Sequence, residues 1–257
     1  MTSLCGILFS GGALIYSDLQ ATSGGRLRSS STETKVYQAA DQRVLLAGTG
    51  SVEGILKAKE AAGREIRVWR SMNGLRPIPP TDVGEILRKV MEPEDEAYFL
   101  LAAYNVENDQ AEIAEISESG FAWKHGLVQV NGSGTPYMHS PALKLEEKVL
   151  ATISSKITTT EQMYQALPKL KFPQKVAMLE GLEVIHCGPK SDVFSGGRGY
   201  QLMVVTQKGV CEYIIPKDEA EKLLKAKWAA ELATINSEST PQKISYEKTF
   251  ERWKVKK

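Results

Sequence analysis

MTSLCGILFSGGALIYSD, residues 1–18, is the stretch of sequence that decides the fold. Two short apolar runs, residues 3–9 and 13–17, are joined by Phe9-Ser10-Gly11-Gly12, a sequence typical of a tight turn. The stretch therefore predicts a β-hairpin with buried arms. A second strand pair is expected at residues 35–38 and 43–48. The polar residues 18–25 between the two pairs are expected to form a loop.

After Gly50 the hydrophobic period changes to that of a helix, and Ser51 is placed to cap it. Helices are expected at residues 52–68, 81–91, 142–155, 158–167, 173–186 and 218–235, and further strands at residues 98–105, 110–117, 120–126, 127–134, 201–206 and 210–214. Because the helical segments can cover two sheets that face each other, this order predicts an α+β fold, a four-layer α/β/β/α sandwich. We expect this domain to span residues 1–215. An extension at residues 216–257 would hold a helix and a polar tail whose basic end, residues 254–257, is solvated.

The composition limits the classes of protein to which the chain can belong. It has 257 residues, with Lys+Arg 32 against Asp+Glu 31 and a formal net charge of +1, so nothing points to nucleic acid or an anionic membrane as a partner. The apolar part of the opening stretch has no basic segment before it and is too short to span a bilayer. The cysteines Cys5, Cys187 and Cys211 lack metal-ligand spacing and are typical of a reduced compartment, so we expect a cytoplasmic protein.

Thr2 is the most informative single residue, because it directly precedes the first predicted strand. If Met1 is removed, Thr2 becomes the N-terminus and carries a hydroxyl nucleophile and a free α-amine on one residue. A hydroxyl is a weak nucleophile until a base takes its proton, and the α-amine can be that base. The chain as given has only one residue before Thr2, so removal of the initiator methionine is the only processing expected.

Six further motifs occur in an order that resembles one family. They are the hairpin after Thr2, residues 17–24 (SDLQATSG), Thr34-Lys35-Val36, Leu46-Ala47-Gly48-Thr49-Gly50, Asn131-Gly132-Ser133-Gly134, and residues 191–197 (SDVFSGG). Together they resemble the proteasome β-subunit family and its bacterial and archaeal homologues, which are N-terminal-nucleophile hydrolases with an α/β/β/α sandwich. The resemblance covers roughly residues 2–214.

The resemblance implies a role for each matched residue. Thr2 would be the nucleophile, Lys35 an ammonium that lowers the pKa of its hydroxyl, and Asp18 the carboxylate that holds Lys35. The Gly48 N–H would stabilise the oxyanion, since a glycine lets the backbone approach the substrate closely. Further roles are implied for the surroundings of the amine (Ser133, Asp192 and Ser195), for backbone pairing with substrate (Thr22 and Gly50) and for the specificity pocket (Ala21 and Leu46). Lys35 lies one residue further from Thr2 than is usual in the family, which requires a one-residue insertion between Gly25 and Thr34.

The resemblance thus implies a threonine endopeptidase that acts on polypeptides through a Thr2 acyl-enzyme, with no metal or organic cofactor. It also implies a homo-oligomer of one or two stacked rings, with an AAA+ ATPase as a possible partner. Two alternatives stay open. The same acyl-enzyme could be resolved by an amine, which would make the protein a transpeptidase or protein ligase. The chain could also be a non-catalytic ring subunit. His125, His139 and His186 have neither metal nor triad spacing and are expected to be structural.

Overall fold

The computed structural model describes residues 2–19, 21–23, 27–29, 35–39, 43–74, 76–123, 126–152, 157, 159–166, 169–191, 198–236 and 247–255. Its first five-stranded sheet has the strand order β10-β1-β2-β11-β12 and its second has the order β5-β6-β7-β8-β9. The first sheet consists of β1 (Ser3–Phe9), β2 (Gly12–Asp18), β10 (Val128–Gly132), β11 (Gly199–Thr206) and β12 (Gly209–Pro216). The second consists of β5 (Val36–Ala39), β6 (Val44–Gly50), β7 (Ala97–Asn105), β8 (Gln110–Ser117) and β9 (Gly120–Trp123).

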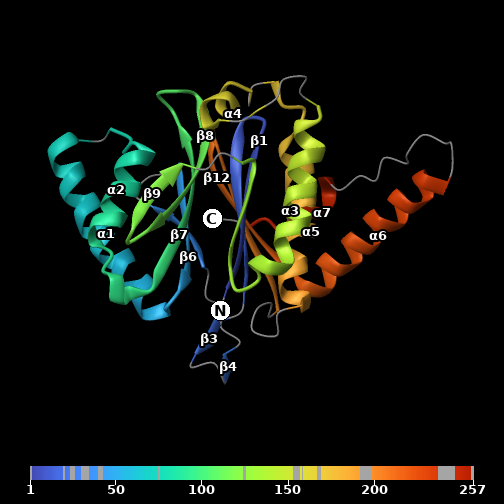
Figure 1. The fold of residues 1–257 in the computed structure, drawn as a ribbon, viewed down its shortest axis with the longest axis horizontal. Helices are drawn as coiled ribbons and strands as arrows, with labels where there is room; N and C mark the ends of the chain where they lie inside the picture. The colour runs from blue at the N-terminus through green and yellow to red at the C-terminus, as the bar shows by residue number, and fades with distance from the viewer. Residues whose placement is uncertain are drawn as a thin grey trace.

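Helices cover the outer face of each sheet, so the predicted four-layer sandwich is confirmed (Figure 1). The second sheet is covered by α1 (Val52–Asn73) and α2 (Pro80–Val90), and the first by α3 (Thr135–Leu150) and α5 (Gln174–Ser191). The remaining helices are the 3-10 turn η1 (Pro93–Asp95), α4 (Thr160–Ala166), α6 (Lys217–Asn236) and α7 (Glu247–Arg252). Every ladder in the two sheets is antiparallel.

The opening hairpin forms as predicted, and both of its strands are buried along their whole length. The register pairs Leu4 with Ser17 and Phe9 with Gly12. A strand covered on both faces has no solvent side, which explains why these runs are continuously apolar and not alternating. The sheets approach closely here, since a Cβ added to Gly6 would lie 2.9 Å from Leu100 Cδ2. Ser51 caps α1 as expected, its side chain accepting a hydrogen bond from the Gly54 N–H at 3.2 Å.

Three expectations about the secondary structure are corrected. The stretch expected to be a loop contains β3 (Ala21–Ser23), which pairs with β4 (Leu27–Ser29) as a separate two-stranded sheet. The helix expected from residue 142 begins at Thr135, with Pro141 inside it. The strand expected to reach residue 126 ends at Trp123. The tail is partly packed, since Phe250 and Trp253 are buried, whereas Lys254, in the basic end expected to be solvated, is exposed and forms a bridge to Tyr213 of β12.

The extension after β12 continues directly into α6, which contacts β11 and β12. In Figure 1 the far end of α6 points away from the two sheets. Lys227 of α6 is 4% exposed and forms salt bridges with Glu180, at 2.9 Å, and with Glu183, both on α5. Apposed carboxylates raise the pKa of Lys227 well above its usual value, despite the opposing effect of burial. The boundary at residue 216 stays a prediction.

Candidate active site

Thr2 lies immediately before β1 and is 9% exposed. Its carbonyl accepts a hydrogen bond from the Ser133 N–H at 2.9 Å, which continues the pairing of β1 with β10 beyond the last strand residues. Gly132 adopts a φ of 95°, and a Cβ there would lie 1.9 Å from the Thr2 carbonyl oxygen. Both the backbone conformation and the contact therefore require glycine beside Thr2.

Asp18 ends β2 and is fully buried, beside the start of β1. Its Oδ1 accepts hydrogen bonds from the Ser3 N–H at 2.8 Å and from Lys35 Nζ at 2.8 Å. The contact of Lys35 with Asp18 that the sequence predicts is therefore present, although Lys35 lies one residue further along the chain than the family spacing. Asp18 is thus bonded to the backbone of the residue that follows Thr2, and Lys35 is bonded to the same carboxylate oxygen.

The pKa of Lys35 is lowered from its ordinary value, and burial is the largest cause. The Asp18 carboxylate acts in the opposite direction, through its charge and its hydrogen bond to the amine, without overcoming burial. The Lys35 side chain is 11% exposed. Lys35 is therefore an amine that releases its proton more readily than a solvated lysine does, and that is held in one place by a buried carboxylate.

Gly48 and Gly50 lie at the end of β6, where the fold itself requires glycine. A Cβ on Gly48 would lie 2.7 Å from Ile55 Cγ2 of α1, and a Cβ on Gly50 would lie 1.9 Å from the Glu96 carbonyl oxygen. Gly50 also adopts a φ of 105°. The expected reason for glycine at position 48 is the close approach of a substrate. The structure adds a second reason, because Ile55 of α1 packs directly over this residue.

The remaining predicted site residues lie in the core, in β3 or outside the described residues. Leu46 is 1% exposed and packs in the core between the second sheet and α1 and α2. Ala21 and Thr22 belong to β3, where Ala21 pairs with Ser29 and Thr22 with Arg28. Asp192 and Ser195 lie outside the described residues.

Sequence reasoning missed two polar links between the sheets beside these residues, the first partly buried and the second fully buried. Thr49 Oγ1 of β6 donates to Asn131 Oδ1 of β10 at 3.1 Å, and Asn131 Nδ2 donates to Glu115 Oε1 of β8 at 2.5 Å. Gln201 of β11 bonds to the backbone of Val36. The available signal was the polar side chain of Gln201 inside an otherwise apolar strand, where a buried amide needs partners.

The comparison with known families is made against this geometry. A family model described as "Proteasome subunit" matches residues 2–162, which is more than half of the chain. The chain belongs to the proteasome subunit family. No curated protein matches it significantly. The matched segment includes the opening hairpin, the strands that carry Asp18 and Gly48, and Ser133 directly after β10, and it ends within α4. Membership of the proteasome subunit family suggests assembly into a ring-like oligomer.

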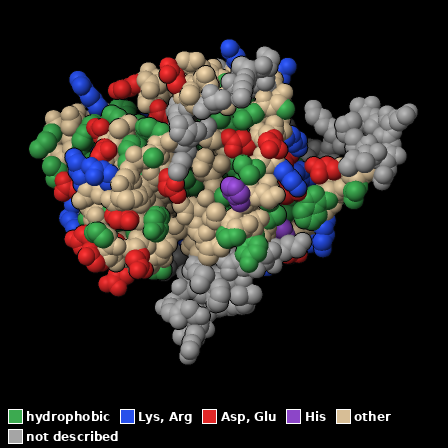
Figure 2. All heavy atoms as spheres, viewed as in Figure 1, with side chains coloured by type: hydrophobic (Ala, Val, Ile, Leu, Met, Phe, Trp, Pro, Cys, Tyr) green, Lys and Arg blue, Asp and Glu red, His purple; other side chains and the backbone are tan. Residues whose placement is uncertain are grey.

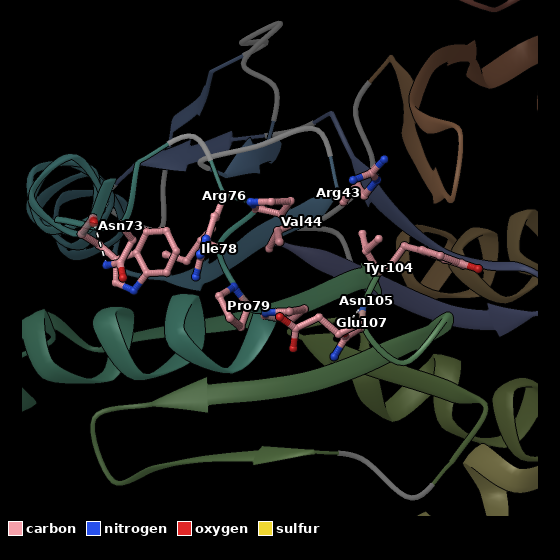
Figure 3. A pocket seen from close by; sticks show the side chains of 13 residues that line it. Arg43, Val44, Asn73, Arg76, Ile78, Pro79, Tyr104, Asn105 and Glu107 are labelled. Carbon is pink, nitrogen blue, oxygen red and sulfur yellow. Dashed lines mark hydrogen bonds between the residues drawn. The ribbon is translucent and has the colours of Figure 1, made fainter. Parts of the chain in front are cut away.

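A cavity in this proteasome-family chain lies away from Thr2. It has a volume of about 420 Å³ and is lined by residues that include Arg43, Trp69, Arg76 and Tyr104 (Figure 3). Val44, which begins β6, also lines it, whereas Gly48 and Gly50 near Thr2 end the same strand. The cavity is therefore at the opposite end of the second sheet from the candidate site.

His186 is buried, and its Nδ1 lies 2.8 Å from the Tyr200 hydroxyl, in keeping with a structural role. On the face shown in Figure 2, acidic and basic side chains are interspersed among hydrophobic ones over α1 and α2. Across the described ranges, no group of three or more His, Cys, Asp or Glu side chains could hold a metal ion. None of the helices in the described part of the chain is long and apolar enough to cross a membrane.

Proposed function

We propose that this subunit is an N-terminal threonine endopeptidase of the proteasome family, with Thr2 as nucleophile once Met1 is removed. The observation that carries the proposal is the buried pair of Lys35 and Asp18, joined at 2.8 Å, with the same Asp18 oxygen bonded to the Ser3 N–H at 2.8 Å. A buried lysine costs free energy to keep, and here its partner Asp18 is bonded to the backbone of the residue that follows the candidate nucleophile.

The chemistry follows from the groups gathered at this point. The Thr2 hydroxyl oxygen forms a bond to the carbonyl carbon of a peptide, and its proton passes to the Thr2 α-amine. The Lys35 ammonium stabilises the developing alkoxide, and the Gly48 N–H stabilises the oxyanion of the tetrahedral intermediate. The amine then gives the proton to the leaving nitrogen as the C–N bond breaks, and water hydrolyses the resulting ester.

The surrounding residues would bind the amine and the substrate. We infer that Ser133, Asp192 and Ser195 orient the α-amine, because Ser133 already contacts the Thr2 backbone. An extended polypeptide would pair with the backbone of Thr22 and Gly50 as an added strand. Ala21 and Leu46 would line the pocket for the substrate side chain and favour an apolar one.

We infer a cytoplasmic homo-oligomer of one or two stacked rings, which encloses the sites and can work with an AAA+ ATPase. Several large apolar side chains of α1, the helix that covers the second sheet, are exposed in the single chain. Among them, Leu56 is 53% exposed and Met72 is 79% exposed. Exposed apolar side chains on one helix favour contact with another subunit.

The test begins with the intact mass of the purified protein, since the mechanism requires a free Thr2 amine. Wild type should cleave unstructured peptides and form a Thr2 ester with an acylating electrophile, as mapped by mass spectrometry. Thr2→Ala should abolish both, whereas Thr2→Ser should keep measurable ester formation because it retains the hydroxyl. Retention of Met1, or peptide cleavage by Thr2→Ala at the wild-type rate, would refute the proposal.

The same assay separates hydrolysis from ligation. A peptide substrate is incubated with an excess of a second peptide that offers a free N-terminal amine. Hydrolysis yields only the two fragments, whereas a transpeptidase yields a joined product of the acyl fragment and the acceptor. A protein with a free Thr2 that forms no ester under either condition would be the non-catalytic subunit.

A further inference from the structure

Gln201 is a fully buried amide in a strand that is otherwise apolar or aromatic on both sides of it. Its side chain crosses from the first sheet to β5 of the second. Gln201 Oε1 accepts a hydrogen bond from the Val36 N–H at 2.9 Å, and Gln201 Nε2 donates one to the Val36 carbonyl at 2.9 Å. One side chain thus satisfies both polar backbone groups of one residue.

This contact replaces a missing strand. β5 is at the edge of the second sheet, as the described strands are ordered, and pairs with β6 through Val36 and Ala47. Both polar groups of a residue in an antiparallel strand point to the same side, so an edge strand leaves them without a strand partner. The Gln201 amide presents one donor and one acceptor, as a neighbouring peptide group would.

The orientation of the amide is set by a second contact. Gln201 Nε2 also donates to Glu212 Oε1 of β12 at 2.9 Å. A carboxylate accepts hydrogen bonds and cannot donate them when ionised, so the NH₂ end of Gln201 must face Glu212. The carbonyl end is then the one that accepts from the Val36 N–H.

The two hydrogen bonds between Gln201 and Val36 connect the two residues of the ion pair through their strands. Val36 follows Lys35 directly, while Gln201 lies on β11, where the register pairs it with Ser17 and pairs Tyr200 with Asp18. Fixing Val36 to Gln201 therefore fixes the Lys35 backbone relative to Asp18. The expected one-residue insertion lies before Lys35 in the chain. The contact of Gln201 with Val36 fixes the backbone directly after Lys35.

We propose that Gln201 is a positioning residue for Lys35: its two hydrogen bonds to Val36 hold the Lys35 amine against Asp18 and beside Thr2. The inference rests on the proposed function for its catalytic consequence. The placement of Lys35 is independent of activity and can be measured separately.

The first test replaces Gln201 by methionine, which has a similar length and no hydrogen-bonding amide. Gln201→Met should lower the rate of Thr2 ester formation by about tenfold to a hundredfold, with the loss in kcat and not in KM, because misplacement of a catalytic group by about 1 Å has that effect. The pH dependence of the rate should also move to higher pH, as a released Lys35 returns toward the ordinary pKa of a solvated lysine.

Two further variants keep the test decisive. Glu212→Leu removes only the group that orients the amide, so it should give a smaller loss of kcat in a stably folded protein; it decides the outcome if Gln201→Met does not fold. Ser10→Ala is the matched control, because Ser10 donates to the Leu170 carbonyl and accepts from the Phe172 N–H at 3.3 Å, at the far end of the hairpin. It should lose stability but leave the rate and its pH dependence unchanged.

A second readout uses an amine-directed acylating reagent and follows the modification of Lys35 in the native protein. Lys35 should react slowly in wild type and in Ser10→Ala, because its amine is buried and bonded to Asp18. It should react at least about tenfold faster in Gln201→Met or Glu212→Leu, where exposure of the amine outweighs the rise of its pKa. Equal Lys35 reactivity and an unchanged pH dependence in the folded variants would overturn the inference. Absence of any Thr2 ester in wild type, with Lys35 still released in the variants, would instead refute the proposed function alone.

Discussion

Replacement of Lys35 by methionine tests the buried ion pair in a way that does not depend on substrate. Methionine keeps most of the aliphatic stem and removes the amine. Asp18 is fully buried, so the variant leaves a carboxylate in the interior without the Lys35 partner that lies 2.8 Å away. Breaking a buried pair by removing one partner costs about 3–5 kcal/mol.

The expected magnitude lies at the lower end of that range. Asp18 keeps its hydrogen bond from the Ser3 N–H at 2.8 Å, and the 11% exposure of the Lys35 side chain lets water approach the vacated position. We expect Lys35→Met to lower the free energy of unfolding by about 3 kcal/mol at pH 8. Urea unfolding followed by circular dichroism measures it, and ester formation at Thr2 should be lost in parallel.

The pH dependence gives the sign of the effect. Burial lowers the pKa of Lys35 in the folded protein below its ordinary value, despite the opposing effect of the Asp18 carboxylate. In alkaline solution the unfolded wild-type chain therefore binds more protons than the folded one, so the free energy of unfolding of wild type rises with pH through that window. Lys35→Met lacks this contribution, so its deficit relative to wild type should be smaller at pH 8 than at pH 10.

Two comparisons make the result interpretable. Lys57→Met removes the salt bridges of a half-exposed amine to Glu92 at 2.6 Å and to Asp95 at 3.2 Å, and should lower the free energy of unfolding much less than Lys35→Met does. Lys35→Met combined with Asp18→Asn should regain stability over Lys35→Met at pH 8, because the buried charge is gone. A deficit below about 1 kcal/mol for Lys35→Met, or one that is equal at both pH values, would refute the reasoning.

Three further changes probe other contacts. Gly132→Ala should lower the free energy of unfolding by roughly 2 kcal/mol or more, because φ is 95° and the new Cβ would meet the Thr2 carbonyl; denaturant unfolding checks this, and Gly120→Ala, where the space is open, is its control. Thr49→Val should lower kcat for peptide cleavage by about tenfold with KM little changed, since the bond to Asn131 that braces the Gly48 segment is lost, whereas Thr49→Ser should retain activity. Lys227→Met should cost about 2 kcal/mol in thermal or urea unfolding, less than a fully buried pair because Glu183 is 27% exposed; no measurable loss would show that this contact does not hold α6 on α5.

The sequence predicted the elements whose pattern is local. The opening hairpin, the strand pair of β5 and β6 and the start of α1 at the Ser51 cap are all set by residues within a few positions of one another. Buried strands give continuous apolar runs, and a capped helix gives a change of period, so these elements can be read directly from the chain. The pairing of Asp18 with Lys35 was predictable only through the resemblance to the family.

What the sequence did not predict depends on partners far along the chain. The burial of Phe250 and Trp253 follows from their packing on the first sheet, which a short polar segment does not reveal. The requirement for glycine at position 48 comes from Ile55 on the following helix. Gln201 reads as an isolated polar residue until Val36, on another strand, supplies its partners.

The position of the candidate site between two sheets explains why these distant polar contacts matter. The first sheet carries Asp18 and the backbone next to Thr2, while the second carries Gly48 and the strand that follows Lys35. The facing sheets meet through apolar side chains, whose attraction is non-directional and tolerates small shifts of one layer over the other. Hydrogen bonds depend on distance and angle, so a buried polar bridge fixes the relative position that apolar packing leaves loose.

Each half of the site has one such bridge. The contact of Thr49 with Asn131, continued to Glu115, joins the strand of Gly48 to the strand beside Thr2. The contact of Gln201 with Val36 joins the strand beside Asp18 to the strand of Lys35. If the two bridges act separately, Thr49→Val should affect the stabilisation of the oxyanion and leave the reactivity of Lys35 unchanged, and Gln201→Met should do the reverse. Equal effects of both variants on Lys35 reactivity would mean that the sheets move as one body and that neither bridge has a specific role.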